Sequence, residues 1–288
     1  MPMPQITDAE ISAAKARLPL AFRAPLPVRL RTAALWIAFV ALFGWCLYDF
    51  GFSPLRIIDG LGRFGRVLGF MFPPYIWTEW QEVAEILNGL GETLAMAFMG
   101  TVLGMVFAFP LAFLGAKTIN RLNFLRLGFR RGFDVIRSFE TLILALVFIR
   151  AFGLGPLPGV LAIAVAEIGV LAKLYSEAIE NASNKPVEGV VASGGSGVQA
   201  IRYAVLPQVF PVLLSITLYN FESNVRTGTI LGIVGAGGIG FLLSDRIQAY
   251  MWDQAWSIIF LIIGMVYLID WLSGLLRARF IGTWEGVR

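Results

Sequence analysis

The sequence predicts an all-α integral membrane protein, and its composition and the lengths of its apolar runs carry that prediction. Of its 288 residues, 57% are hydrophobic and only 15% are charged, whereas soluble proteins average about 25% charged residues. The apolar residues gather in runs of about 20, which is the length that a helix needs to cross the core of a bilayer. We therefore expect one membrane-embedded domain rather than two soluble ones.

Six such runs are expected to be transmembrane helices. In chain order they cover residues 32–48, 92–116, 133–152, 158–175, 207–233 and 255–276. The first run starts too far from the N-terminus, and lacks a small-residue cleavage site after it, to be a removed signal peptide. The runs divide the chain into a tail, a first helix with an outer segment, a main transmembrane domain and a second tail, at residues 1–31, 32–87, 88–276 and 277–288. Prolines make the first tail a poor helix, apart from an amphipathic piece at 8–18.

Basic residues set the expected orientation, because lysine and arginine near membrane helices favour the cytoplasmic side. They gather in three places: the N-terminal tail, the connection after the second run, and the chain after residue 276. Both termini are therefore predicted to be cytoplasmic. The segment 49–91 also carries arginines, Arg56, Arg63 and Arg66. Its stretch "LRIIDGLGRFGRVLGFMF" nevertheless has the pattern of an amphipathic helix, which we expect at the outer interface.

The sequence lacks the residues that several classes of function need. The chain has no histidine and a single cysteine, Cys46, which argues against Ser-His-Asp or Cys-His catalysis, histidine-ligated zinc and a disulfide framework. No Gly-x4-Gly-Lys-[Ser/Thr] sequence is present, so the chain is not expected to hydrolyse ATP. The net charge of +4 comes from residues beside apolar runs rather than from a basic stripe, so no nucleic-acid partner is expected. We predict no cofactor, no metal and no catalytic residue.

The string "GIVGAGGIG" at 232–240 contains the spacing of a dinucleotide-binding fingerprint, at Gly235, Gly237 and Gly240. That fingerprint needs a preceding strand and an acidic residue about 20 positions later. The preceding "NFESNVRTGTIL" is not a clean strand, and no Asp or Glu lies near Phe260. We therefore expect these glycines to allow close backbone packing or a re-entrant turn at the outer end of the fifth run.

The segment 176–207 has too much helical patterning for a simple connection. Pro186 and Glu188 are typical of a helix start, because proline fits the first turn and a carboxylate faces the positive end of the helix dipole. Gly194 and Gly195 should end that helix. The following "VQAIRYAVL" predicts a second helix that ends before Pro207.

This arrangement resembles the EAA motif of permease subunits of bacterial ABC importers, in which a short cytoplasmic helix docks on an ATPase. Glu188, Gly194, Leu206 and Pro207 fall in the motif's places, and Gly189 stands where the first alanine usually is. The residues that the resemblance assigns to ATPase coupling are Pro186, Glu188, Gly189, Gly194, Ser196, Leu206 and Pro207.

The resemblance extends over about 88–276 and is most specific in "NFESNVRTGTILGIVGAGGIG", which is similar to phosphonate-type importer permeases. One departure is Phe139, where many related permeases have proline and a kink. The residues assigned by resemblance to the translocation path or its gate are Glu222, Ser223, Asn224, Arg226, Thr227, Gly235, Gly237, Gly238 and Gly240.

The resemblance implies a six-transmembrane-helix ABC importer permease fold with an interfacial outer helix and a cytoplasmic coupling helix. It also implies a homodimer in the inner membrane of a bacterium, two ATPase subunits and an external substrate-binding protein. The implied cargo is phosphonate or a related phosphorus oxyanion such as phosphate or phosphite. A permease for another small solute, such as methionine, is the alternative.

Two other classes remain as rivals. A membrane-embedded enzyme would need a cluster of titratable or metal-binding groups, and a structural scaffold would not need a glycine-broken inner loop.

Ionisable groups inside the expected spans are few, and such groups usually face a partner or a cavity. Glu222 and Arg226 are four residues apart and are expected to share a helix face. They form either a packing ion pair or a site where Arg226, with its planar fork, meets a passing oxyanion. Glu167 and Lys173 are six residues apart and do not share a face, so the sequence names no partner for Glu167. Arg137 and Glu140 are expected to reach the inner interface.

Overall fold

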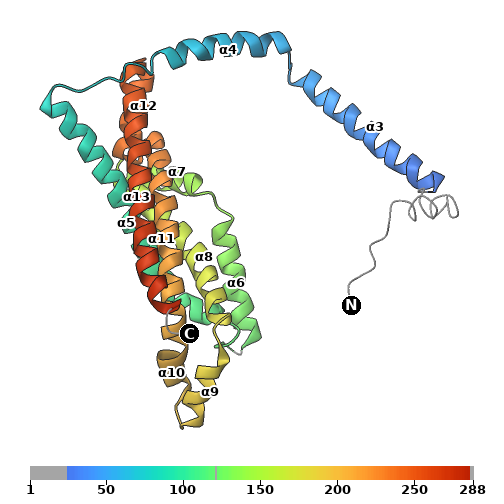
Figure 1. The fold of residues 1–288 in the computed structure, drawn as a ribbon, viewed down its shortest axis with the longest axis vertical. Helices are drawn as coiled ribbons and strands as arrows, with labels where there is room; N and C mark the ends of the chain where they lie inside the picture. The colour runs from blue at the N-terminus through green and yellow to red at the C-terminus, as the bar shows by residue number, and fades with distance from the viewer. Residues whose placement is uncertain (1–24, 121, 286–288) are drawn as a thin grey trace, which may run out of the picture. The chain divides into compact units, whose positions relative to one another are not determined.

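The computed structural model describes residues 25–120 and 122–285, with side chains to residue 279 (Figure 1). Within those ranges every regular element is a helix and no strand occurs, which confirms the predicted all-α class. The chain divides into two compact units, 1–66 and 67–288. The amphipathic piece expected at 8–18 lies outside the described residues.

The first unit contains α3 (Leu26–Asp49) and most of α4 (Pro54–Gly69). α3 is an apolar helix of 24 residues, about 36 Å long at 1.5 Å per residue, and none of its residues is buried. It is the first predicted span, extended at its N-terminal end. α4 places Arg56 and Arg63 on one side and apolar residues such as Ile58 and Leu61 on the other, so the expected amphipathic helix is present.

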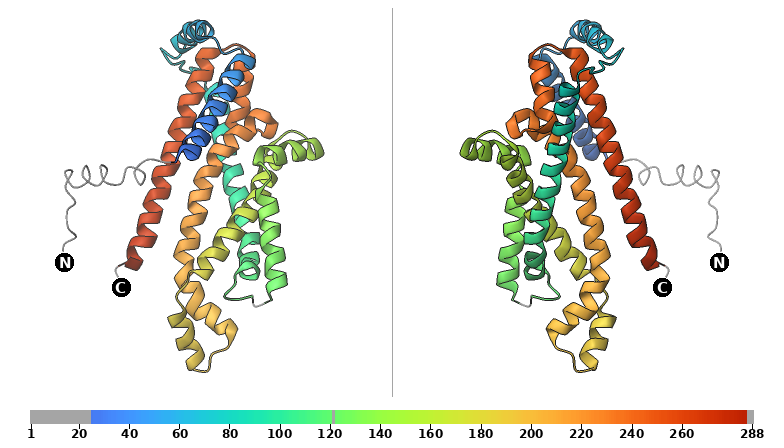
Figure 2. Two further views of the ribbon diagram at one scale, coloured as in Figure 1. Left: turned by 90° about the vertical axis from the view of Figure 1, so that its right-hand side faces the viewer. Right: turned by 90° about the vertical axis from the view of Figure 1, so that its left-hand side faces the viewer.

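The second unit is a bundle in which α5 (Trp80–Gly115), α8 (Pro156–Glu180), α11 (Leu206–Leu231) and α13 (Trp252–Glu285) run alongside one another (Figures 1 and 2). α5 and α8 approach closely because a Cβ atom on Gly100 would come within 2.6 Å of Ile163, and one on Gly104 would overlap Glu167. Small residues at a helix crossing are the usual means of packing helices in lipid. Among the described residues, these four helices and α3 are the five that are long and apolar enough to cross a membrane.

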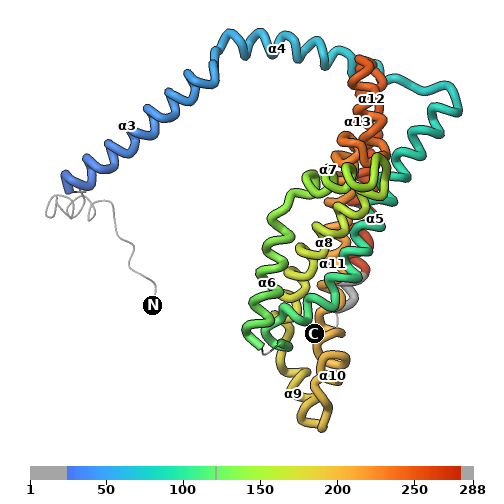
Figure 3. Tube along the Cα trace, turned by 180° about the vertical axis from the view of Figure 1, so that it is seen from behind, coloured from blue at the N-terminus to red at the C-terminus, as the bar shows by residue number. Residues whose placement is uncertain are grey.

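The third predicted span, 133–152, is wrong as a single helix. α6 (Asn123–Arg137) ends before Ser138, and α7 (Thr141–Phe152) has only 12 residues, about 18 Å of helix, which is too short for a bilayer core of about 30 Å. α6 runs alongside α8, whereas α7 lies across the direction of the long helices (Figures 2 and 3). The chain breaks at 138–140 without a proline, and the Ser138 hydroxyl donates to the Val135 carbonyl (2.7 Å) at the end of α6.

Two more ends differ from expectation. α5 begins at Trp80, well before the predicted residue 92. α13 does not stop at residue 276 but continues to Glu285, so the predicted C-terminal tail is helical as far as it is described. These extensions carry charged residues that a hydropathy argument leaves outside the spans.

Candidate coupling loop and translocation path

The α9–α10 loop, residues 181–205, joins α8 to α11 and projects beyond the other helices of the bundle (Figure 2). It contains α9 (Asn184–Ala192) and the short α10 (Gly197–Ala200). Gly194 has a φ of +85°, and the amide of Gly195 donates to the Val190 carbonyl at 2.9 Å, which ends α9 as the paired glycines predict. Ser196 caps α10, since its hydroxyl accepts from the Gln199 amide at 3.4 Å and the Gln199 side chain accepts from the Ser196 amide at 2.7 Å.

Two details of this loop correct the sequence-based reading. α9 starts at Asn184, so Pro186 lies in its first turn as expected, but Glu188 lies beyond that turn, where the helix dipole contributes little. The second helix does not end before Pro207. The chain stays helical from Gly197 through Leu231, and a π-helical stretch at Ile201–Val205 ends two residues before the proline. The wider turn accommodates the missing amide hydrogen of Pro207 without breaking the helix.

Gln208 is a residue that the sequence analysis missed. Its side-chain oxygen accepts from the Ser183 amide at 3.1 Å, and its nitrogen lies 3.3 Å from the Ser183 carbonyl and 2.7 Å from the Ala204 carbonyl. One carboxamide therefore ties the residue before α9 to the first turn of α11. A glutamine next to a Leu-Pro pair gives no signal of such a role, because Ser183 is 25 residues away in the chain.

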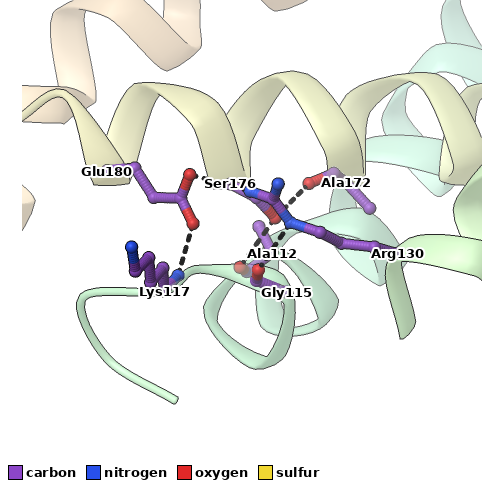
Figure 4. Close-up of polar contacts among 7 residues, drawn as sticks. All are labelled: Ala112, Gly115, Lys117, Arg130, Ala172, Ser176 and Glu180. Carbon is purple, nitrogen blue, oxygen red and sulfur yellow. Dashed lines mark hydrogen bonds and ion pairs between the residues drawn. The ribbon is translucent and has the colours of Figure 1, made fainter. Parts of the chain in front are cut away.

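The end of α8, where the α9–α10 loop begins, is fixed by polar contacts with α6 and with the connection after α5. Glu180, the last residue of α8, accepts from the amide of Lys117 and is paired with Arg130 of α6 at 2.8 Å (Figure 4). Arg130 also donates to the carbonyl of Gly115 at 3.1 Å, where α5 ends. The ends of α5 and α8 and the middle of α6 thus meet at one ion pair, and a cation at the C-terminus of α5 is favourable for that helix.

Behind the loop lies a cavity of about 530 Å³. Its wall is mainly apolar, and it is formed by α9, α10, the end of α8 and the connection after α5. The lining includes Ile119, Ile179, Val187, Val191, Ile201 and Val205.

The glycine turn, residues 232–240, joins α11 to α12 (Gly238–Gln248) at the other end of α11 and includes the first residues of α12. Gly235, Gly237 and Gly238 have φ values of +106°, +83° and +71°, a region that side chains rarely adopt. A Cβ on Gly240 would overlap the Thr229 carbonyl, and one on Gly232 would come within 2.5 Å of the Gly237 carbonyl. The expected close packing of these glycines is therefore confirmed.

The start of α12, where a dinucleotide would place its phosphate, is already bonded to α5. The Glu92 carboxylate accepts from the Gly238 amide at 2.7 Å, and the Thr93 hydroxyl accepts from the Ile239 amide at 2.9 Å. An anion at a helix N-terminus satisfies the free amides there. The element before the turn is a helix and not a strand, so the dinucleotide reading is excluded on both grounds.

Midway along α11, Asn224 reaches two neighbouring helices. Its side-chain nitrogen donates to Glu167 of α8 at 2.9 Å and to the Thr101 hydroxyl of α5 at 3.0 Å. Asn224 is thus the partner of Glu167 that the sequence could not name. Lys173 pairs elsewhere, with Asp134 of α6 at 2.6 Å. Because Thr101 and Glu167 lie near the middle of their helices, this stretch of α11 lies near the middle of the bundle.

Two residues before Asn224, Glu222 pairs with Arg226 as their spacing predicts, with 3.2 Å between Oε1 and Nη1. Glu222 is buried, whereas the Arg226 side chain is 49% exposed. Ser223 and Thr227 are partly exposed, and the Thr227 hydroxyl bonds to the Ser223 carbonyl at 3.1 Å. The α11 residues predicted to line the path therefore separate into a buried group around Asn224 and a more exposed strip that contains Arg226. Arg137 and Glu140 are exposed at the α6–α7 break.

Residues 100–282 match the family described as "Binding-protein-dependent transport system inner membrane component". A putative phosphite transport system permease of Stutzerimonas stutzeri is 38% identical over 239 residues, which is 83% of each chain. A phosphate-import permease of Mycolicibacterium smegmatis is 40% identical over 197 residues, 68% of this chain and 37% of that protein. A putative cryptic phosphonate transport system permease of Escherichia coli is 49% identical over 121 residues, 42% of this chain and 99% of that protein.

Solved structures agree on the fold. The inward-facing methionine ABC transporter matches with a TM-score of 0.62 and 22% identity, over 70% of this chain and 99% of that chain. An amino acid ABC transporter matches with a TM-score of 0.59 and 19% identity, over 71% and 100% of the two chains.

Proposed function

The chain belongs to the family of binding-protein-dependent transport system inner membrane components, and on that premise we propose that it forms the translocation path of an ABC importer for a phosphorus oxyanion. The observation that carries the choice of cargo is that relatives covering most of this chain are described as permeases for phosphite or phosphate. The arginine at mid-bundle supports it, because a guanidinium keeps its charge and matches an oxyanion's geometry. Likeness to the methionine transporter supports the fold alone.

The membrane-spanning chain needs partners for this role. ATP hydrolysis is assigned to two separate ATPase subunits, and cargo delivery to an external binding protein. We assign ATPase docking to the α9–α10 loop, through Pro186, Glu188, Gly189, Gly194 and Ser196, with Leu206 and Pro207 at the base of α11. Gln208 supports this assignment, because its bonds to Ser183 would transmit movement of α9 directly to α11. Two copies of the chain, related by a two-fold axis, would enclose the path.

The mechanism is alternating access. ATP closes the ATPase dimer, α9 moves with it, and the loop carries α11 to reopen the path outward. Arg226 faces the path, with Ser223 and Thr227 beside it as hydrogen-bonding groups, and the glycine turn with Gly235, Gly237, Gly238 and Gly240 forms its outer gate. A half-exposed guanidinium at this level would be costly against lipid, which supports its facing an aqueous path.

The proposal is tested by reconstitution of the full chain with its ATPase and binding protein in proteoliposomes. ATP-dependent uptake of phosphite, phosphate or a phosphonate is expected, and unlabelled phosphorus oxyanion should compete whereas methionine should not. Uptake of methionine, or of no phosphorus oxyanion that the binding protein binds, would refute the assignment of cargo. The mass of the purified complex separates a homodimer from a pairing with a second, different permease chain.

The proposed orientation has its own test. A cysteine at Ser193 should be labelled only from the cytoplasmic side, and one at Asp245 only from outside, in a background where Cys46 is replaced. Labelling of both positions from the same side would contradict the assigned topology.

The role of Arg226 is tested by the double variant E222Q/R226Q, which removes both charges but keeps hydrogen-bonding groups. If the pair only fixes packing, uptake should stay close to wild type, because both charges of the pair are removed together and Arg277, which also contacts Glu222, keeps Asp270 as a carboxylate neighbour. We expect assembly to survive and uptake to fall. Uptake within about twofold of wild type would assign the pair to packing.

A further inference from the structure

A second arginine reaches Glu222 from the neighbouring helix. Arg277 of α13 places its Nη2 atom 3.6 Å from Glu222 Oε2, while Arg226 of α11 lies 3.2 Å from Oε1. Each oxygen of one buried carboxylate therefore faces a different guanidinium. Hydropathy places Arg277 outside the last span, but the continuation of α13 to Glu285 brings it against α11.

The level of this cluster matters because ionisable groups cost most near the middle of a membrane. Glu222 lies half a turn before Asn224, which is bonded to the middle of α5 and α8. Glu222 and Arg226 consequently lie near the middle of the bundle, where an ionisable group is retained only for a partner or a path. The backbone of Arg277 lies about 37 Å along α13 from Trp252, and its side chain reaches back to Glu222.

The charges of the cluster balance. A second carboxylate, Asp270 of α13, lies 3.9 Å from Arg277 and is 55% exposed, so two carboxylates accompany two arginines. Each guanidinium has five N–H donors, yet Arg226 contacts carboxylate through Nη1 and Arg277 through Nη2. Most donors on both planar forks are left for another acceptor, and the two forks belong to different helices.

We propose that Arg226 and Arg277 together form an oxyanion-binding step in the path, with Glu222 and Asp270 as the carboxylates that keep the binding weak. The inference rests on the proposed function. A tetrahedral phosphorus oxyanion presents several oxygens, and two guanidinium forks can bind them at once. A transported anion must also leave, so a site without excess positive charge suits a path better than one with two uncompensated cations.

Because the two arginines lie on different helices, binding at this site depends on the conformation of the bundle. Any movement of α11 relative to α13 changes the spacing between the guanidinium groups, and with it the fit to one anion. The affinity of this step would therefore differ between the inward-open and outward-open states, which is what a ligand needs in order to shift such an equilibrium.

The test is the charge-balanced variant R277Q/D270N in the full importer, reconstituted with its ATPase and binding protein. Glu222 keeps Arg226 as its partner in this variant, so no carboxylate is left unpaired. We expect uptake of the phosphorus oxyanion to fall at least tenfold while binding-protein-stimulated ATP hydrolysis stays within about twofold of wild type. R277K, which keeps the charge but loses the planar fork, should reduce uptake about three- to tenfold.

A matched control is R246Q/E85Q, which removes an ion pair of the same 3.6 Å length between α12 and α5. It should leave uptake within about twofold of wild type.

Uptake within twofold in R277Q/D270N would overturn the inference while leaving the proposed cargo intact. Loss of uptake together with loss of stimulated hydrolysis, or an equal loss in the control, would assign the cluster to packing and overturn it as well. If R277Q/D270N does not assemble, wild-type uptake by R277K decides against the inference. If the wild-type importer takes up no phosphorus oxyanion that its binding protein binds, the proposed function itself fails.

Discussion

Two glycine-rich segments flank α11, and they differ in what surrounds the glycines. At the α9–α10 loop, a Cβ atom on Gly189, Gly194 or Gly197 would meet nothing within 4 Å. At the glycine turn, a Cβ atom on Gly238 or Gly240 would overlap atoms of α5 or α11. In the loop, Gly194 needs its backbone angle and Gly195 is crowded only by Val190 of the same loop, so the loop surface stays open. The turn needs glycine because no space is left for a side chain between it and α5 or α11.

This difference indicates that the two ends of α11 have different roles: the glycine turn fixes one end, and the α9–α10 loop can move the other. The glycine turn is bonded to α5 through Glu92 and Thr93, so that end is fixed within the bundle. The loop is attached through Gln208 and Ser183 and exposes its outer face to a partner. We infer that the turn provides the rigid end of α11 and the loop its handle.

The largest expected effect is at the fixed end. Gly240→Ala places a methyl group on the Thr229 carbonyl, and overpacking against backbone cannot be relieved by a rotamer change. We expect a loss of about 3 kcal/mol in the free energy of unfolding, the upper end of the usual cost of overpacking, measured by denaturation in detergent. Gly197→Ala, in open space, is the control and should change the stability by less than about 1 kcal/mol. Equal stability of the two variants would contradict the distinction between the ends.

The next effect separates stability from coupling. Gly194→Leu forces a φ of +85° on a residue with a side chain, which costs about 1–2 kcal/mol locally and reshapes the loop. The bundle should still insert and fold. Uptake and binding-protein-stimulated ATP hydrolysis in proteoliposomes should fall at least tenfold. Coupling at the wild-type level would show that the loop geometry does not matter for docking.

A smaller effect is expected where the α9–α10 loop is bonded to α11. Gln208→Leu removes the hydrogen bonds to Ser183 and leaves that residue's backbone groups without their partner. Uptake should fall about three- to fivefold, corresponding to about 1 kcal/mol, the net value of a typical hydrogen bond. Gln208→Glu keeps the acceptor for the Ser183 amide and should lose less. Identical losses in the two variants would mean that side-chain volume, not hydrogen bonding, is responsible.

The smallest effect is a gain. Gly189 lies inside α9 with open space around it, and alanine is favoured over glycine in a helix by about 0.5–1 kcal/mol. Gly189→Ala should slow amide hydrogen exchange in α9 by up to about fivefold, with unchanged global stability. Faster exchange would show that α9 needs the glycine for a contact absent from the isolated chain.

The sequence by itself determined the class of this protein. Long apolar runs can satisfy their backbone hydrogen bonds in lipid only as helices, so composition and length sufficed for the all-α membrane fold. Local chemistry also sufficed where neighbours in the chain decide the outcome: the end of α9 at the paired glycines, and the Glu222–Arg226 pair at a spacing of four residues.

Only the tertiary structure decided the contacts between distant segments. Hydropathy joined α6 and α7 because it sums apolar character and does not detect a break that needs no proline. Hydropathy also gave Arg277 no partner, because Glu222 meets it from another helix. The partners of Glu167 and Gln208 could not be predicted either, because they too lie far away in the chain. Hydrogen bonds to Asn224 and Ser183 depend on how the helices pack side by side, which no local pattern encodes.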